Sequence, residues 1–297
     1  MYNMIDVVTV GFALFAMLFG AGNLIFPPML GYQLGSSWGV ASFAFILTGV
    51  GIPLMGIIAS ANAGKSLDSF SDKVSPLFAR FYGIALILSI GPLLALPRTG
   101  ATAYEVTFYH AGFTTSIWKY IYLGIYFLLA LLFSLKSSKV VDRVGKILTP
   151  ILLIVLFIIL VKGVFFNDLP IAERIYELPF KKGFTEGYQT MDALGAALMA
   201  GVVISDLTRR GYTEKKEQHQ MMFGVGIVSF ILLAAVYSSL TYAGATVSTV
   251  YDASVQRPAL LIGLIEQLLG SFGKVAMGIA VSFACLTTSV GLITTCG

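Results

Sequence analysis

Charged side chains are scarce in this chain. Lys, Arg, Asp and Glu make up only 11% of its 297 residues, while hydrophobic residues make up 57%. An ordinary soluble domain carries about 25% charged residues. The composition therefore excludes such a domain and indicates a protein with several membrane spans in a lipid bilayer. The formal net charge of +4 is small and spread over loops, so nucleic acid is not expected as a partner.

Cysteines and catalytic motifs are also few. Cys285 and Cys296 lie eleven residues apart in one apolar segment, about 16 Å along a helix, which is too far for a disulfide. The sequence contains no GxSxG, no HExxH and no pair of aspartates typical of membrane proteases or phosphatases. We therefore expect that the protein is not an enzyme.

The apolar segments predict eight membrane spans, because a helix needs about 20 residues to cross a bilayer. The third segment is longer and should be broken at Gly91-Pro92 and at Pro97. The predicted spans are residues 7–30, 38–63, 77–104, 117–135, 146–166, 188–207, 221–245 and 272–297.

Basic residues predict the orientation of these spans. Lys and Arg number eleven in the loops on the side of the N-terminus and seven in the loops on the other side, which favours a cytoplasmic N-terminus. The long loops 164–187 and 246–271 then lie outside. Within the second, residues 258–269 are apolar but too short to span, so we expect a re-entrant cap.

An unusual sequence interrupts the first span. FALFAMLFGAGNLIFPP (12–28) has Gly20, Ala21, Gly22 and Asn23 at its centre. Glycine weakens a helix and an amide is costly in hydrocarbon, so we predict a helix break there. Unwound backbone at this depth needs a cavity or a ligand, and broken helices in transporters hold a zwitterion and its coupling cation. A packing notch of small residues is the alternative, although it does not explain Asn23.

The last span carries adjacent hydroxyl side chains, Thr287, Thr288 and Ser289. They suit a Na⁺ site, because a hard cation takes neutral oxygen ligands. The alternative is that each hydroxyl bonds the carbonyl four residues before it. At 1.5 Å per residue, Thr287 and the break in the first span both lie near the midplane of the bilayer.

Further polar residues are candidates for a gate or for ion coupling. Arg98 and Glu105 lie two helical turns apart in the third span, and charges at this depth indicate function. The alternative is a snorkelling arginine and an interfacial glutamate. Asp192 opens the sixth span, either as a cation or proton partner or as a helix cap. Gly195 is the candidate for a second helix break.

Three motifs together resemble the bacterial branched-chain amino acid:cation symporter family. They are FGAGNLIFPP (19–28), PRTGATAYE (97–105) and GYQTMDALGA (187–196). The resemblance covers the whole chain. It implies Na⁺-coupled uptake of leucine, isoleucine or valine across the bacterial cytoplasmic (inner) membrane, with Na⁺ as the co-transported ion and no other cofactor. Family members are longer, with roughly twelve spans. The resemblance therefore also implies that this chain is a C-terminally truncated fragment that binds its amino acid substrate poorly.

That family is similar, more distantly, to transporters with the five-plus-five inverted-repeat fold of the bacterial leucine transporter. This implies an all-α polytopic fold with breaks in spans 1 and 6, a first repeat over 1–167 and an incomplete second repeat over 188–297. The substrate site implied comprises Gly20, Ala21, Gly22, Asn23 and Gly195, with the N–H groups of Ala21 and Gly22 on the carboxylate. The Na⁺ ligands implied are the carbonyls of Ala16, Phe19 and Ala284 and the hydroxyls of Thr287 and Thr288.

The match to the leucine transporter group is incomplete. That group has an arginine just before Phe-Pro, whereas this chain has Ile25, so its outer salt-bridge gate is not implied. A second cation site, at the Leu18 carbonyl and the Asn23 amide, follows only if the family keeps it. Two alternatives stay open: an H⁺-coupled or differently specific amino acid transporter, and a non-transporting sensor or channel subunit. The sequence leaves the oligomeric state open.

Overall fold

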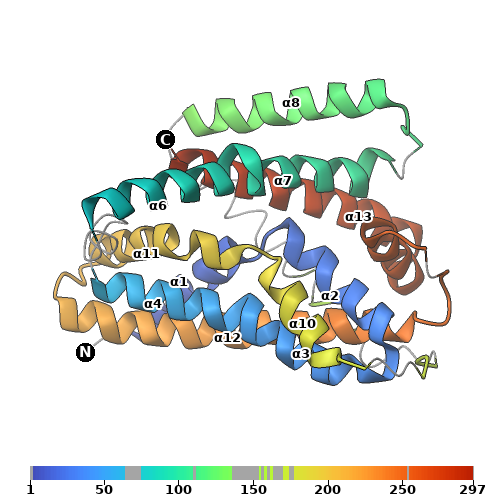
Figure 1. The fold of residues 1–297 in the computed structure, drawn as a ribbon, viewed down its shortest axis with the longest axis horizontal. Coiled ribbons are helices and arrows are strands. Elements are labelled where there is room, and N and C mark those ends of the chain that lie inside the picture. The colour runs from blue at the N-terminus through green and yellow to red at the C-terminus, as the bar shows by residue number, and fades with distance from the viewer. Residues whose placement is uncertain are drawn as a thin grey trace.

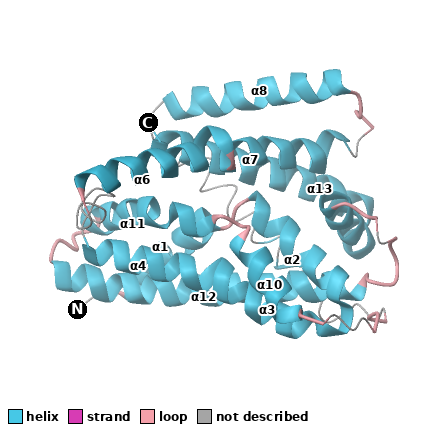
Figure 2. Ribbon diagram, in the orientation of Figure 1, coloured by secondary structure: helices cyan, strands magenta, loops and turns pink. Residues whose placement is uncertain are grey.

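The computed structural model describes residues 3–63, 75–109, 112–135, 154, 157–158, 161–162, 170–173, 177–252 and 254–296. Throughout this part of the chain the regular secondary structure is helical (Figures 1 and 2). The predicted fifth span, 146–166, lies almost entirely outside the described residues. The expectation of an all-α protein is confirmed for the rest.

Eleven α-helices are described. In chain order they are α1 (Met4–Leu18), α2 (Ala21–Leu34), α3 (Trp38–Ile46), α4 (Ile52–Ala63), α6 (Pro76–Leu88), α7 (Ala95–Tyr104), α8 (Ser116–Leu135), α10 (Pro179–Tyr188), α11 (Asp192–Arg209), α12 (Lys215–Thr246) and α13 (Arg257–Cys296). Short turns of other helical type continue or join them, at Gly35–Ser37, Leu47–Gly51, Ser89–Leu93 and Glu105–Tyr109.

Five helical stretches among the described residues are long and apolar enough to cross a membrane. They are Gly22–Ala61, Pro76–Tyr109, Ser116–Leu135, Lys215–Thr246 and Gly273–Ile293. A sixth candidate is the pair α10 and α11, which meet at a bend of 42°. The chain is therefore a multi-pass membrane protein. Five falls short of the predicted eight for three reasons. The predicted fifth span lies almost entirely outside the described residues, and the sixth corresponds to the bent pair. In addition, α1 is short, and α2, α3 and α4 follow one another closely enough to count as one stretch.

Two predicted irregularities have clear backbone causes. The third span is kinked at Gly91, whose φ and ψ of −78° and −112° are not helical, which confirms the break at Gly91-Pro92. Pro97 does not break the chain, because it lies in the first turn of α7, where the missing N–H of proline has no helical acceptor to lose.

The two long loops contain helices. The loop predicted over 164–187 includes most of α10, and the apolar piece 258–269 forms the first part of α13. Gly270 then kinks α13 with φ 69° and ψ −170°, a conformation that essentially only glycine adopts. Leu260 and Leu264 are fully buried beside Tyr32 of α2, so this piece packs into the protein.

The helices pack in layers around a common apolar core. In Figure 1, α12 lies along one edge and α8 along the opposite edge, with α11 between α12 and the pair α7 and α13. Aromatic rings in this core lie next to the end of α1. The ring centroids of Phe15 and Phe19 are 5.3 Å apart, and Tyr237 of α12 lies 6.1 Å from Phe19 and 5.3 Å from Phe45. This packing holds the end of α1 in the middle of the protein.

Candidate functional site

The first helix break lies at Phe19 and Gly20. Helix α1 ends at Leu18 and α2 begins at Ala21, and between them Phe19 has φ −83° and ψ 80° and Gly20 has φ −95° and ψ −178°. The predicted interruption is therefore present, but it is shorter than the GAGN motif. Ala21 to Asn23 form the first turn of α2 instead of an unwound segment.

The break redirects backbone hydrogen bonds. In a continuous helix the Gly20 N–H would donate to the Ala16 carbonyl, but it donates to the Leu18 carbonyl at 3.0 Å. The Asn23 N–H likewise donates to the Gly20 carbonyl at 3.1 Å and not to that of Phe19. The carbonyls of Ala16 and Phe19 thus lose their helical donors. These are two of the carbonyls that the family resemblance assigns to a cation.

The other side of the break presents N–H groups. Ala21 and Gly22 are the first two residues of α2, and N–H groups at a helix start have no helical acceptor and carry partial positive charge. The Arg98 guanidinium lies against this turn, because a Cβ atom at Gly22 would come within 1.7 Å of Arg98 Nη2. A glycine at position 22 is what allows this approach.

The second break lies between α10 and α11. Helix α10 ends at Tyr188 and α11 begins at Asp192, and Met191 between them is left-handed with φ 66°. Gly195 was expected to break this span, which is wrong: it lies within α11. Asp192 is not the cap of α11 either, because the capping position is Met191 and no side chain makes a capping bond.

Asn23 joins the two breaks. Its side chain is 1% exposed, and its Nδ2 group donates to the Leu18 carbonyl and, at 2.9 Å, to Asp192 Oδ2. Its Oδ1 atom is buried with no hydrogen-bond partner among the described residues. One amide therefore links the end of α1, the start of α2 and the start of α11.

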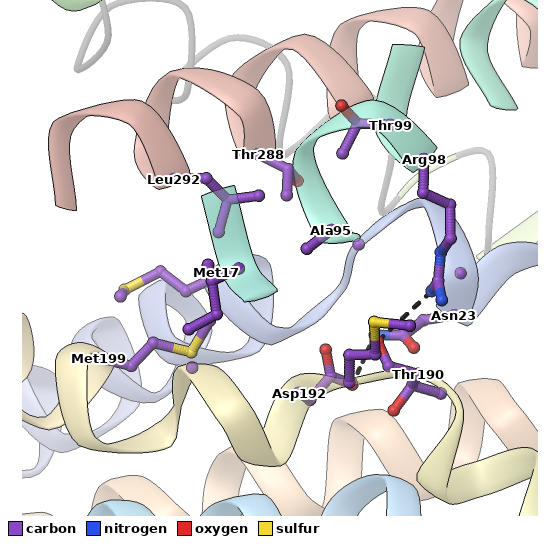
Figure 3. A pocket seen from close by; sticks show the side chains of 15 residues that line it. Met17, Asn23, Ala95, Arg98, Thr99, Thr190, Asp192, Met199, Thr288 and Leu292 are labelled. Atoms are coloured by element: carbon purple, nitrogen blue, oxygen red, sulfur yellow. Dashed lines mark hydrogen bonds between the residues drawn. The ribbon is translucent and has the colours of Figure 1, made fainter. Parts of the chain in front are cut away.

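A pocket lies between the two breaks (Figure 3). It encloses about 70 Å³, room for several water molecules. Its polar and charged side includes Asn23, Arg98 and Asp192, and aliphatic side chains complete the wall. The lining residues are Met17, Gly20, Gly22, Asn23, Ile90, Ala95, Arg98, Thr99, Thr190, Met191, Asp192, Gly195, Met199, Thr288 and Leu292.

Arg98 is held by neutral groups. Nη1 donates to the Gln189 carbonyl at 2.8 Å and Nη2 to the Thr190 carbonyl at 3.4 Å, both in the second break. Its Cζ atom also lies 5.1 Å from the centre of the Phe26 ring. Arg257 lies 4.4 Å from the same ring centre, so Phe26 has cation–π contacts with two arginines.

Arg257 was not among the site residues predicted from the sequence. Arg257 Nη2 lies 3.0 Å from both carboxylate oxygens of Glu186, which also pairs with Lys182 at 2.9 Å. Arg257 starts α13 and Glu186 belongs to α10, 71 residues earlier. No local motif marks the pair, because the charges lie in loops by sequence and meet only through tertiary packing.

The hydroxyl groups of the last span divide into two sets. Thr287 and Thr288 both donate to the Ala284 carbonyl at 2.9 Å. For Thr288 this is the bond to the fourth residue before it that was given above as the alternative, and Thr287 bonds the third residue before it. Thr288 nevertheless lines the pocket, and its methyl carbon lies 4.0 Å from where a Cβ atom of Gly20 would be. A hydroxyl that donates keeps lone pairs with which it can bind a cation.

Ser289 takes no part in the pocket. Its hydroxyl is fully buried and lies 2.5 Å from that of Thr99 and 2.8 Å from that of Tyr126. Glu105 is also outside the pocket. It lines a separate cavity of about 460 Å³ with Lys119, so the structure does not bring it to Arg98.

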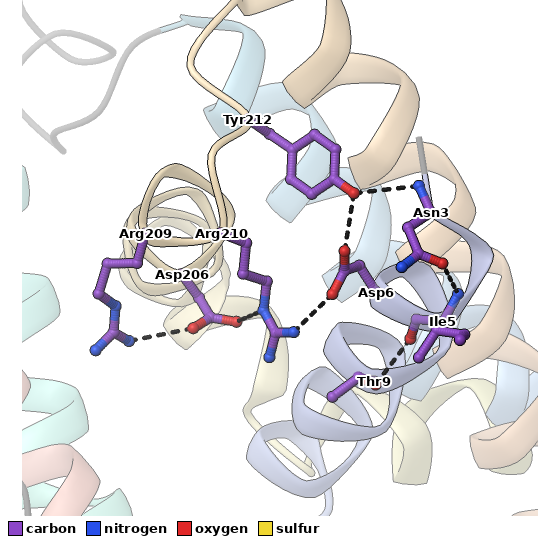
Figure 4. Close-up of polar contacts among 8 residues, drawn as sticks. All are labelled: Asn3, Ile5, Asp6, Thr9, Asp206, Arg209, Arg210 and Tyr212. Atoms are coloured by element: carbon purple, nitrogen blue, oxygen red, sulfur yellow. Dashed lines mark hydrogen bonds and ion pairs between the residues drawn. The ribbon is translucent and has the colours of Figure 1, made fainter. Parts of the chain in front are cut away.

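A polar network connects the start of α1 with the end of α11 (Figure 4). Asp6 accepts hydrogen bonds from the Tyr212 hydroxyl at 2.9 Å and from Arg210 Nη1 at 2.8 Å. Arg210 Nε also donates to Asp206 at 2.9 Å, and the Asn3 N–H donates to Tyr212 at 3.1 Å. The bonds from Tyr212 and Arg210 lower the pKa of the Asp6 carboxyl below its usual value of 3.8.

The fold and site define a multi-pass membrane protein with a charged pocket between two interrupted helices. Residues 3–297 match the family model described as "Branched-chain amino acid transport protein". The chain is 40% identical over 301 residues to the branched-chain amino acid permease BraB of Bacillus subtilis (strain 168), covering 98% of this chain and 67% of that protein. It is 38% identical over 303 residues to a putative branched-chain amino acid carrier protein of Staphylococcus aureus (strain USA300), and the match covers 96% of this chain and 67% of that protein.

The chain belongs to the branched-chain amino acid transport protein family. This confirms the resemblance drawn from the three sequence motifs. The family and its named members are transport proteins, which also confirms the expectation that the chain is not an enzyme.

Proposed function

We propose that the protein is a secondary active transporter that carries leucine, isoleucine or valine with Na⁺ into the cell across the bacterial cytoplasmic membrane, with its N-terminus inside. Family membership supports branched-chain amino acids as the substrate class. The single observation that carries the proposal further is that both helix breaks border one pocket, the arrangement in which transporters hold substrate and ion.

The amino acid lies in this pocket with its carboxylate at the start of α2. The N–H groups of Ala21 and Gly22 have no helical acceptors and carry the positive end of the helix dipole. The aliphatic side chain packs against the apolar part of the lining, which includes Met17, Ile90 and Leu292. The cavity of about 70 Å³ is smaller than the roughly 300 Å³ of common ligand pockets, so substrate entry widens it.

Na⁺ binds between α1 and α13. The carbonyls of Ala16 and Phe19 have lost their helical donors, and the Thr288 side chain lies beside Gly20 and lines the pocket. With Thr287 and the Ala284 carbonyl they supply the neutral oxygens that a hard cation takes. The ion ties the two helices together in the outward-facing state and releases them when it leaves to the cytoplasm.

The resemblance to the leucine transporter group supports the proposed division into two repeats. Residues 1–167 form a first five-helix repeat and 188–297 form three spans of a second, inverted repeat. The chain covers 67% of the length of BraB, so this assignment concerns the part of the transporter that the two share.

Uptake of radiolabelled leucine into vesicles containing a full-length version of the transporter tests the proposal. We expect uptake to depend on an inward Na⁺ gradient and T288A to need a higher Na⁺ concentration. Ser239→Ala is the matched control, because Ser239 is half-buried and its hydroxyl likewise donates to a carbonyl of its own helix, that of Ala235. Uptake that does not depend on Na⁺ but depends on an inward H⁺ gradient would favour the H⁺-coupled alternative. Conductance without concentrative uptake would favour a channel.

A further inference from the structure

We propose that Arg98 and Asp192 recognise the two charged groups of the substrate. The Arg98 guanidinium binds the α-carboxylate and the Asp192 carboxylate binds the α-ammonium group. This inference rests on the proposed function, because it takes an amino acid to occupy the pocket between the two breaks. It gives the pocket a specific charge arrangement in addition to the backbone groups of α2.

Arg98 and the start of α2 direct positive charge to the same place. The guanidinium lies so close to Gly22 that a Cβ atom there would be 1.7 Å from Nη2. Figure 3 shows the Arg98 side chain extending from α7 toward Asn23 and Thr190. A carboxylate beside this turn is attracted by the helix dipole and by a full positive charge, and it receives charge-assisted hydrogen bonds.

The hydrogen bonds of Arg98 leave room for such a ligand. A guanidinium has five N–H donors, and the bonds of Arg98 to described residues go to two neutral carbonyls. Among the described residues no carboxylate forms an ion pair with it. Asp192 is a nearby negative charge on the same pocket, but it makes no direct contact with the guanidinium. A substrate carboxylate can therefore form the direct, charge-assisted hydrogen bonds with Arg98 that Asp192 does not make.

Arg257 provides the contrast. Both arginines lie over the ring of Phe26. The distance from Cζ to the ring centre is 5.1 Å for Arg98 and 4.4 Å for Arg257. Arg257 is already paired with Glu186 and does not line the pocket. Arg98 lines the pocket and has no carboxylate partner, so of the two it is the one available to a substrate.

Asp192 supplies the opposite charge. It lines the same pocket, and no ion pair joins it to Arg98 within the described residues. Its Oδ2 atom accepts one hydrogen bond from Asn23, and the Oδ1 atom of Asn23 is buried and makes no hydrogen bond within the described residues. An ammonium group brings three donors to a place that holds a carboxylate and an unpaired amide oxygen.

The aliphatic lining completes the match. Met17, Ile90, Ala95, Met199 and Leu292 also border the pocket. A zwitterion needs one group of each charge, and a branched side chain needs an apolar wall. The pocket combines all three features, so it selects α-amino acids with aliphatic side chains over amines and carboxylic acids of the same shape.

Competition binding with two leucine analogues tests this assignment. Leucinamide keeps the ammonium group but has no carboxylate, and 4-methylpentanoate keeps the carboxylate but has no ammonium group. At about pH 6.5 the leucinamide amine is protonated. We expect the wild-type protein to prefer leucine over both analogues, measured by displacement of radiolabelled leucine in the presence of Na⁺.

R98Q should lose the preference for leucine over leucinamide and keep that over 4-methylpentanoate, and D192N should do the reverse. R98Q lowers the affinity for leucine and 4-methylpentanoate at least about tenfold but not the affinity for leucinamide. D192N lowers the affinity for leucine and leucinamide but not that for 4-methylpentanoate. R257Q keeps both preferences, because that arginine does not line the pocket. If R98Q does not fold, R98K gives the same comparison with a single charge that cannot bind a carboxylate in bidentate form.

The outcomes separate this inference from the proposed function. If R98Q and D192N weaken leucine and both analogues by one common factor, the two residues support the structure or a gate, and the assignment is overturned. The assignment is also overturned if R98Q still prefers leucine over leucinamide as strongly as the wild-type protein does. If the wild-type protein binds no leucine, isoleucine or valine, the proposed substrate class itself fails.

Discussion

Replacing Gly31 by alanine should push α2 away from α12. A Cβ atom at Gly31 would lie 1.7 Å from the Thr241 carbonyl oxygen of α12, and one at Gly244 of α12 would lie 1.9 Å from the Pro28 carbonyl oxygen of α2. Both obstacles are backbone atoms, which no rotamer change can remove. Small residues at such contacts let membrane helices approach closely.

The cost can be worked from these distances. A carbon atom and a carbonyl oxygen approach to about 3.3 Å, so Gly31→Ala requires the two backbones to separate by roughly 1.6 Å. Overpacking of a close-packed interior costs about 1–3 kcal/mol. For a protein of this size that corresponds to a fall of roughly 2–12 °C in the unfolding midpoint. Alanine's higher helix propensity offsets at most about 1 kcal/mol of this.

Thermal unfolding of the detergent-solubilised protein measures the effect, with the loss of monomeric protein on size exclusion as the readout. Gly39→Ala is the control, because nothing lies within 4 Å of a Cβ atom at that exposed position, and its midpoint should not fall. The double variant G31A/G244A should cost less than the sum of the two single changes, since one separation relieves both contacts. Wild-type stability in Gly31→Ala would refute the close approach of α2 and α12.

Two further perturbations have definite expected results. The lowered pKa of Asp6 means that its bonds stabilise the fold above its usual value of 3.8 and are lost as the pH falls through the lowered pKa. Asp6→Asn, which removes the ion pair with Arg210, should therefore reduce the unfolding midpoint more at pH 7 than at pH 2, and an equal reduction at both would contradict this. Ser289→Ala should cost about 1–3 kcal/mol, because it deprives the buried Tyr126 hydroxyl of a partner. Ser239→Ala should change the midpoint little, because that hydroxyl bonds only a carbonyl of its own helix.

Local sequence was sufficient where the cause of a feature is local. The break in the first span was predictable because glycine and asparagine disfavour a helix in hydrocarbon whatever surrounds them. The kink at Gly91 was predictable because Pro92 has no N–H to donate. The exact position of the first break was not predictable from local sequence. Ala21 to Asn23 form a helical turn, in which the Asn23 side chain has hydrogen-bond partners.

The second break shows why a local cause was not enough. Gly195 has the backbone freedom of a glycine, yet the chain turns at Met191, which has a side chain and a positive φ. The carbonyls of Gln189 and Thr190 in this turn accept hydrogen bonds from Arg98, which lies some 90 residues earlier. Contacts from another helix therefore accompany a backbone conformation that propensity disfavours.

The sequence by itself determined that this protein spans a membrane several times and that its first span is interrupted, because composition and backbone propensity are properties of the residues themselves. Its three motifs also determined the family. Tertiary structure decided that Asn23 meets Asp192, that Arg98 lies over Gly22, and that Glu105 is excluded from the pocket. These pairings depend on how whole helices pack, and residues up to 169 positions apart share no local signal that could reveal it.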